Sequence, residues 1–263
     1  ATLARDKRGP LDLDLPERKI RLKADGTVDR VEIPPRLEAN RLIEEFMIAA
    51  NVAAAETLED KRQHLIYRAH DEPSVEKLNA LSEFLATIGV RLAKGQTMRA
   101  KQFNEILAKV RDTEHEHVVN EVVLRSQAQA EYTSQNYGHF GLNLRRYAHF
   151  TSPIRRFADL VVHRALIGSL GLGNDGLTRS EEDRLEETSA LISAAERRAM
   201  AAERDTVDRL IAAYLSEQID KTFDARISGV TKAGLFVQLP AYGADGFVPV
   251  SSLGNDYYIF DES

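Results

Sequence analysis

The apolar residues of this chain change their spacing at about Gln218. Before that point they recur every three to four positions over long stretches, the last of which ends near Tyr214. This spacing is typical of helices that bury one face. After it, apolar and polar residues alternate in three short runs separated by glycines, which is typical of β-strands joined by turns. The sequence therefore predicts an α+β protein with a mostly helical domain at residues 1–216 and a small all-β domain at residues 217–263.

The small domain has the pattern of an OB-type barrel. Its predicted strands contain residues 223–229, 235–239 and 246–250. Strands of such barrels stack nucleic-acid bases on aromatic side chains, so Phe236 is a candidate RNA contact. Because an OB barrel is five-stranded, we expect residues 217–263 to form only the N-terminal part of one.

The first domain is predicted to open with a short β segment or hairpin and to continue as helices. Leu11 to Leu15 alternate with aspartates, and Asp25-Gly26 marks a turn before a second run that ends at Pro34. From Glu38 a helix is predicted, and further helices follow, including one announced by Pro73 and Ser74 and a long one opened by Ser180. The apolar stripe of the helix that begins at Glu38 is predicted to consist of Leu42, Ile43, Phe46, Met47, Ala50 and Ala54.

The charge and residue composition of the chain exclude some classes of protein. The net charge is −6 and the pI is about 5.7, which argues against a protein that coats DNA, because that function needs a broad basic surface. Arginines nevertheless cluster in two parts of the sequence, so a basic channel inside an acidic exterior is compatible with the negative net charge. The clustered arginines are Arg145, Arg146, Arg155, Arg156, Arg164, Arg197, Arg198 and Arg204. There is no cysteine and no apolar run of membrane-spanning length, so we expect a cytoplasmic protein without a membrane partner.

The segment YAHFTSPIRRF at residues 147–157 predicts a phosphate site. Ser152 is suited to cap a helix and Pro153 to its first turn. That places Arg155 and Arg156 at a helix N-terminus, where cations are unfavourable unless an anion lies between them and the amides. The alternative is an ordinary capped helix whose arginines pair with surface carboxylates.

Two groups of residues contain metal-ligand types but lack the spacing or setting of a metal site. Asp12 and Asp14 lie on one face of a predicted strand, where polar residues usually face water. His115 and His117 are two positions apart on a predicted helix, about 200° around its axis, whereas a zinc pair needs two histidines four apart. No metal site is predicted within this chain.

Five strings, together with their order and spacing, closely resemble the catalytic domain of the RNase II/RNase R exoribonucleases. They are RGPLDL at residues 8–13, LIEEFMIAAN at 42–51, YRAHDEPS at 67–74, GHFGL at 138–142 and the segment from Tyr147 to Arg164. Residues after Gln218 resemble the RNA-binding OB domain that follows the catalytic domain in RNase R. The resemblance therefore covers the C-terminal half of the RNB catalytic domain and a truncated OB-fold domain.

The resemblance implies processive, 3′-to-5′ hydrolysis of single-stranded RNA to nucleoside 5′-monophosphates, assisted by Mg²⁺. It places Arg155 beside the scissile phosphate and one residue of the pair Glu44 and Glu45 near the terminal nucleotide. The two glutamates lie about 100° apart on a helix, so one of them is expected to face the channel, and the sequence leaves open which. The predicted RNA contacts are Tyr147, His149, Thr151, Ser152, Arg156, Arg197 and Phe236.

The chain also departs from the family pattern. The early aspartate cluster that binds the metal in the family is absent from this sequence, as are the domains that precede it. We therefore expect Mg²⁺ in the complete enzyme and none on this chain alone, which should bind RNA weakly without cleaving it and should need the missing N-terminal part of the same enzyme. The alternative is a non-catalytic RNA-binding module that has lost the metal site.

Overall fold

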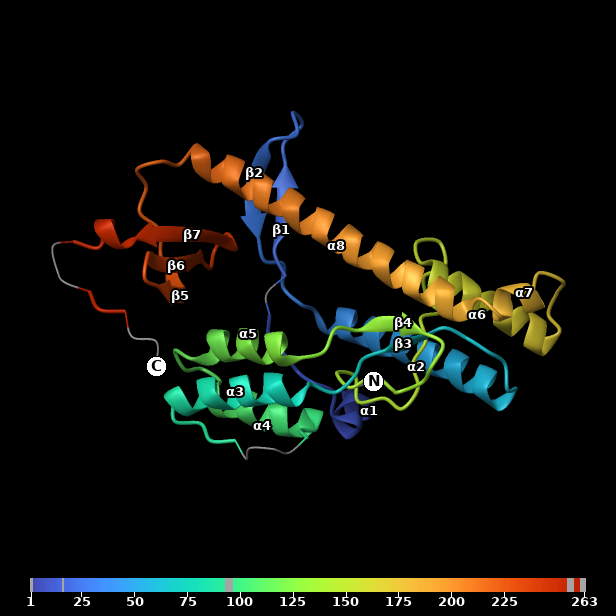
Figure 1. Cartoon of the computed structure of the whole chain (residues 1–263). Helices are drawn as coiled ribbons and strands as arrows, with labels where there is room; N and C mark the ends of the chain where they lie inside the picture. Colours follow the sequence, from blue (N-terminus) through green and yellow to red (C-terminus); the bar gives the residue numbers. More distant parts are fainter. Residues whose placement is uncertain (1, 16, 93–96, 255–257, 261–263) are drawn as a thin grey trace. The chain divides into compact units, whose positions relative to one another are not determined.

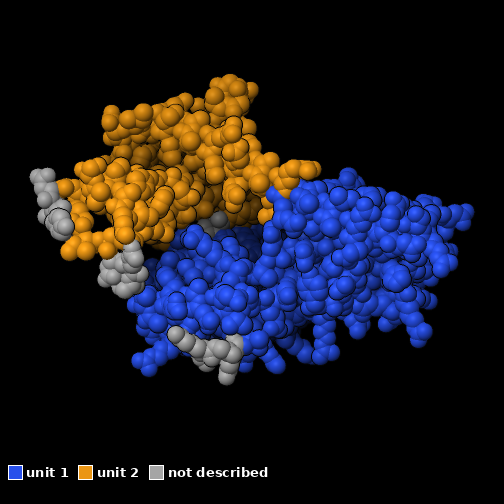
Figure 2. Space-filling view, in the orientation of Figure 1, with its two compact units in different colours: residues 1–15, 36–197 blue, residues 16–35, 198–263 orange. Residues whose placement is uncertain are grey.

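A computed structural model describes residues 2–15, 17–92, 97–254 and 258–260. The chain divides into two compact units, one of residues 1–15 and 36–197 and the other of residues 16–35 and 198–263 (Figure 2). Helices and short antiparallel sheets make up both (Figure 1), which confirms the predicted α+β class. The predicted domain boundary after residue 216 stays a prediction. Among the described residues, no helix is both long and apolar enough to cross a membrane.

Unit 1 contains a cluster of three short helices around Phe103, which is fully buried. These helices are α3 (Val75–Thr87), α4 (Ala100–Val110) and α5 (Glu116–Ser126). Ser74 caps α3 by accepting a hydrogen bond from the Lys77 amide, as its position before an apolar stripe predicts. The leucines and valines that these helices bury face one another, so the cluster is held mainly by apolar burial.

The segment of residues 11–15 forms no strand, so the predicted β segment is wrong at this place. Leu11 and Leu13 pack against the three-helix cluster, which accounts for the alternating pattern. The backbone amides of Asp12 and Asp14 donate to the side chains of Asn104 and Asn120, at 2.9 and 2.8 Å, instead of to a neighbouring strand. A helix, α1 (Thr2–Arg8), precedes this segment.

A second core joins α2 (Glu38–Asp60) to α6 (Phe157–Leu170) and to a small antiparallel sheet of β3 (Tyr67–Ala69) and β4 (Glu131–Thr133). The predicted apolar stripe of α2 is largely wrong. Leu42, Ile43, Phe46 and Met47 are exposed, and the buried positions are Glu45, Ile48, Asn51, Ala54, Ala55 and Leu58. Buried Glu45 and Asn51 each have polar partners, described below, which satisfies the main requirement for burying them.

Two helix starts also differ from prediction. Helix α6 begins at Phe157 and not directly after Ser152, and residues 152–156 form a turn in which the amides of Arg155 and Arg156 donate to the Ser152 carbonyl, at 3.3 and 3.1 Å. The long helix is α8 (Leu185–Ser216), and a separate short helix, α7 (Arg179–Glu182), precedes it, capped by Thr178.

Unit 2 contains the three strands predicted after Gln218 and the hairpin predicted before Pro34. The strands are β5 (Arg226–Thr231), β6 (Gly234–Leu239) and β7 (Ala244–Pro249), which pair antiparallel in sequence order, followed by the short 3-10 helix η1 (Val250–Ser252). The hairpin consists of β1 (Lys19–Leu22) and β2 (Val28–Glu32). Arg18, just before β1, donates two hydrogen bonds to the Pro240 carbonyl, and its side chain fills the space where a Cβ on Gly243 would lie.

Candidate RNA-binding site

A cavity of about 180 Å³ lies between α2 and the loop that precedes α6. It brings together residues that are about a hundred positions apart in the sequence. Four of the predicted RNA-contact residues line it, and so does Arg155. The lining residues are Glu44, Met47, Ile48, Asn51, Leu142, Tyr147, Thr151, Ser152, Arg155 and Arg156.

The two adjacent arginines of this loop differ in what they contact. Arg156 donates two hydrogen bonds, at 2.7 and 2.8 Å, to the carboxylate of Asp159, which is completely buried. The same carboxylate accepts the amide of Ser152 at 2.7 Å. Arg155 is exposed, and its guanidinium makes no hydrogen bond or ion pair with any residue that the structure describes. Of the two, Arg155 is the one whose charge is available to a ligand.

The structure also separates the two glutamates of α2. Glu44 lines the cavity with Arg155 and pairs with Arg36. Glu45 is buried on another side of the helix, where Arg8 of α1 binds it through two hydrogen bonds of 2.8 and 2.9 Å. The geometry therefore places Glu44 at the candidate site.

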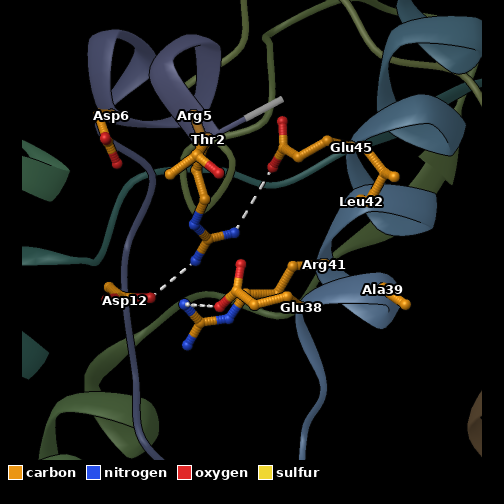
Figure 3. Close-up of a pocket in the computed structure, with 9 residues that line it drawn as sticks. All are labelled: Thr2, Arg5, Asp6, Asp12, Glu38, Ala39, Arg41, Leu42 and Glu45. Atoms are coloured by element: carbon orange, nitrogen blue, oxygen red, sulfur yellow. Dashed lines mark hydrogen bonds and ion pairs between the residues drawn. The ribbon is translucent and has the colours of Figure 1, made fainter.

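Glu45 belongs to a separate cavity of about 410 Å³, shown in Figure 3. There Arg5 of α1 reaches between Asp12, at 2.7 Å, and Glu45, at 3.6 Å. Two basic side chains, Arg5 and Arg41, and four acidic ones line this cavity, and Arg41 lies beside Glu38 of the same helix at 3.6 Å. The contacts of Arg5 and Arg8 with Glu45 join α1 to α2, which is a structural role.

Behind the first cavity lies a row of rings packed edge to face. The ring centroids of Tyr132 and His149, of His149 and Tyr147, and of Tyr147 and His139 are 5.3 to 5.6 Å apart. Burial, with the nearby Arg156 and Arg68, lowers the pKa of His149 to about 3. Burial, with His70 next, lowers the pKa of His139 to about 3. Both imidazoles are therefore neutral at pH 7, and burial also raises the pKa of the Tyr147 hydroxyl.

Three predicted RNA contacts lie outside the lining of the cavity. His149 accepts or donates a hydrogen bond with the Tyr132 hydroxyl at 2.9 Å and is half-buried. Arg197 is exposed on α8. Phe236 is 46% exposed on β6 and lies 5.1 Å, centroid to centroid, from Phe247 of β7, which is 43% exposed. The two rings are directly paired across the strands and offer an exposed aromatic surface.

Asn51 and Asp159 are the polar residues of this site that sequence reasoning missed. Both are almost fully buried and both bind backbone amides of the loop. Asp159 stands three positions after Arg156, a spacing at which an ion pair on a helix is common, so that pairing had a signal in the sequence. The contacts of Asn51 have no such signal in the sequence, because its partners lie in another part of the chain.

Among the described residues, no three histidine, aspartate or glutamate side chains converge in a way that would hold a metal ion. These residues therefore supply no ligand set for the Mg²⁺ that the resemblance implies.

The fold and this site correspond to a known class of protein. The family model for the RNB domain matches residues 2–171, and that for the S1 RNA binding domain matches residues 217–263. The chain belongs to the RNB family. It is 40% identical over 267 aligned residues to ribonuclease R of Escherichia coli (strain K12), with 98% of this chain and 33% of that protein covered.

Solved structures agree with that relationship. The apo form of Mycoplasma genitalium RNase R superimposes with a TM-score of 0.89 at 30% identity, over 99% of this chain and 41% of that one. The same enzyme in complex with ribose methylated single-stranded RNA gives a TM-score of 0.88 at 28% identity, with the same coverage. The chain thus spans about a third of the length of the curated relatives it matches.

Proposed function

We propose that this chain is part of a processive 3′-to-5′ exoribonuclease that hydrolyses single-stranded RNA to nucleoside 5′-monophosphates. Membership of the RNB family and the presence of an S1 RNA binding domain support this proposal. So does the likeness to RNase R, one solved structure of which holds single-stranded RNA. The remaining part of the same enzyme is the partner, and its location in the cytoplasm stays a prediction from composition.

One observation carries the proposal. The exposed guanidinium of Arg155, which has no partner among the residues that the structure describes, lies in a cavity with the hydroxyl-bearing residues Thr151 and Ser152, while the neighbouring Arg156 is neutralised by buried Asp159. A phosphodiester is an anion that hydrogen-bond donors and a guanidinium bind well. Placed beside the scissile phosphate, Arg155 would stabilise the charge that develops on its oxygens. Glu44, on the facing helix, would contact the terminal nucleotide.

The chain alone is proposed to bind RNA and not to cleave it. Mg²⁺ as the cofactor of the complete enzyme is proposed on the resemblance only. Binding by phosphate neutralisation makes a prediction for this chain as it stands: log affinity for a short single-stranded RNA should fall with log salt by about 0.7 per phosphate contacted. Arg155→Ala should reduce that slope by about the same amount. An unchanged slope would show that Arg155 does not contact a phosphate of the RNA.

Catalysis is tested on the full-length protein with a 5′-labelled single-stranded RNA. Arg155→Ala is expected to lower kcat by about 100-fold or more, as the loss of one transition-state donor does elsewhere, and to change KM much less. The matched control is Arg209→Ala, which removes an exposed arginine of α8 that pairs with Asp205. Equal kcat for both variants would refute the role of Arg155. RNA binding without release of mononucleotides by the wild-type protein would favour the alternative, a non-catalytic RNA-binding module.

A further inference from the structure

The loop that carries Arg155 is irregular backbone: residues 147–156 form no helix or strand. The Tyr147 carbonyl accepts the Arg68 amide of β3 at 2.9 Å. Other polar groups of the loop need partners outside a helix or strand ladder, and side chains supply them. Asp159 accepts the Ser152 amide at 2.7 Å, and His163 contacts the Phe150 carbonyl at 2.8 Å. Because a carbonyl only accepts, Nε2 of His163 must carry the proton. Both of these side chains come from α6.

Asn51 is the side chain that ties this loop to the opposite wall of the cavity. It lies on α2, is 3% exposed, and uses both ends of its amide. Its Nδ2 donates to the Tyr147 hydroxyl at 2.9 Å, and its Oδ1 accepts the Phe150 amide at 2.9 Å. The contacts fix the loop immediately before Thr151 and Ser152.

The same helix supplies the facing wall of the cavity. Glu44, Met47 and Ile48 all precede Asn51 on α2 and line the site together with it. One buried amide therefore fixes the loop to the element that carries Glu44. This hydrogen-bonded link acts directly on the distance between the Arg155 side and the Glu44 side of the cavity. The contacts from α6 act on that distance through the apolar packing of α6 and Ala148 with α2.

We propose that Asn51 is a positioning residue for the phosphate site: through Tyr147 and Phe150 it sets where Thr151, Ser152 and Arg155 lie relative to α2. The proposal rests on the function proposed above. Asn51 itself need not touch RNA. Without its oxygen the Phe150 amide loses its partner, and the loop can shift towards a position that satisfies it. A displacement of about 1 Å at a reacting centre can cost roughly 100-fold in rate.

The test is a double-mutant cycle on the full-length protein, with Asn51→Leu and Arg155→Ala alone and together. Leucine fills a similar volume and forms neither hydrogen bond. Asn51→Leu should lower kcat about tenfold or more, with a smaller change in KM. In the Arg155→Ala background it should cost less than about threefold, because its effect acts through Arg155. If Asn51→Leu does not fold, Asn51→Ser replaces it, since a serine hydroxyl is too short to reach both partners.

The matched control is Asn120→Leu. Asn120 is also 3% exposed, and it also uses both ends of its amide. Its Oδ1 accepts the amide of Asp14, which lies in an irregular segment, and its Nδ2 donates to the Glu116 carbonyl. It lies outside the cavity lining, so its loss should lower stability by a similar amount and leave kcat unchanged. The proposal is overturned by equal losses of kcat in both Asn variants, by no loss in the Asn51 variant, or by losses that multiply fully with Arg155→Ala. If Arg155→Ala has no effect, the role proposed for Arg155 fails and this inference fails with it, whereas the exoribonuclease function itself fails only if the wild-type protein releases no mononucleotides.

Discussion

The loop at residues 147–156 and the sheet β5–β7 are two candidate RNA-contacting regions, and they are built in opposite ways. The loop lies outside the helices and strands and depends on the buried side chains of Asn51 and Asp159 and on half-buried His163. The sheet is held by its own antiparallel ladder, and its paired Phe236 and Phe247 are partly exposed to solvent. The loop offers the charge of Arg155, which has no partner among the described residues, and the sheet offers an apolar surface.

This difference bears on what each region is suited to do. A charge held by buried donors and acceptors has a defined position, which is what stabilising a reacting phosphate requires. Aromatic side chains on a sheet stack with any base, which suits binding without sequence preference. We therefore expect changes in the loop to affect stability and turnover strongly and changes in the sheet to affect RNA affinity modestly.

The largest effect is expected at Asp159. Asp159→Ala leaves Arg156, whose side chain is 20% exposed, without its partner and leaves the Ser152 amide unsatisfied. The free energy of unfolding should fall by ~3–5 kcal/mol, as when one partner of a buried ion pair is removed. Urea unfolding followed by circular dichroism measures it. Asp205→Ala, which breaks an exposed pair on α8, is the control and should cost less than about 1 kcal/mol. Equal losses would mean that the buried pair is not what holds the loop.

Lowering the pH should reduce the stability of unit 1 and leave that of unit 2 unchanged. All seven histidines of the sequence lie in unit 1, and burial lowers the pKa of His139 and His149 from 6.5 to about 3. Between those values the unfolded chain takes up protons that the folded chain does not, so stability falls as the pH drops below 6.5. From pH 7 to pH 5 the loss should be about 2 kcal/mol per histidine.

Hydrogen exchange detected by mass spectrometry at the two pH values resolves the units. After correction for intrinsic exchange rates, protection in β3 and β4 should fall at pH 5 while protection in β5–β7 stays constant. An equal fall in both units, or none in unit 1, would contradict the assignment of the two histidines as buried and neutral.

The smallest effect is expected on the sheet. Phe236→Ala should weaken binding of single-stranded RNA by about 1 kcal/mol, near the low end for a base–aromatic stack, because Phe247 still offers a ring. The salt dependence should not change, since no charge is removed. Fluorescence anisotropy with a labelled oligonucleotide measures both. Ile227→Ala is the control, because Ile227 is 61% exposed on β5 and has no ring; an equal loss there would refute stacking by Phe236.

Prediction from sequence succeeded where local spacing decides the structure. The helix that begins at Glu38, the helix capped by Ser74 and the three strands after Gln218 are all present. It failed where burial depends on which neighbour covers a face. Four of the six residues of the predicted α2 stripe are exposed, because α2 packs through its alanines, Ile48 and Leu58 and through two polar residues with distant partners. Helix α6 begins four residues later than predicted, because residues 152–156 form a separate turn whose Ser152 amide is bound by the Asp159 side chain.

The sequence by itself determined the α+β class, the family and the candidacy of Arg155, because period, motif order and residue type are local properties of the chain. Only the tertiary structure decided that Glu44 faces the cavity while Glu45 binds Arg8, that Arg156 is neutralised and Arg155 is not, and that Asn51 holds the loop. The reason is physical, because the side chains of Glu45 and Asn51 form hydrogen bonds with groups 37 to 99 positions away in the sequence. Buried polar groups require such partners, but pairing between distant residues leaves no periodic pattern in the sequence.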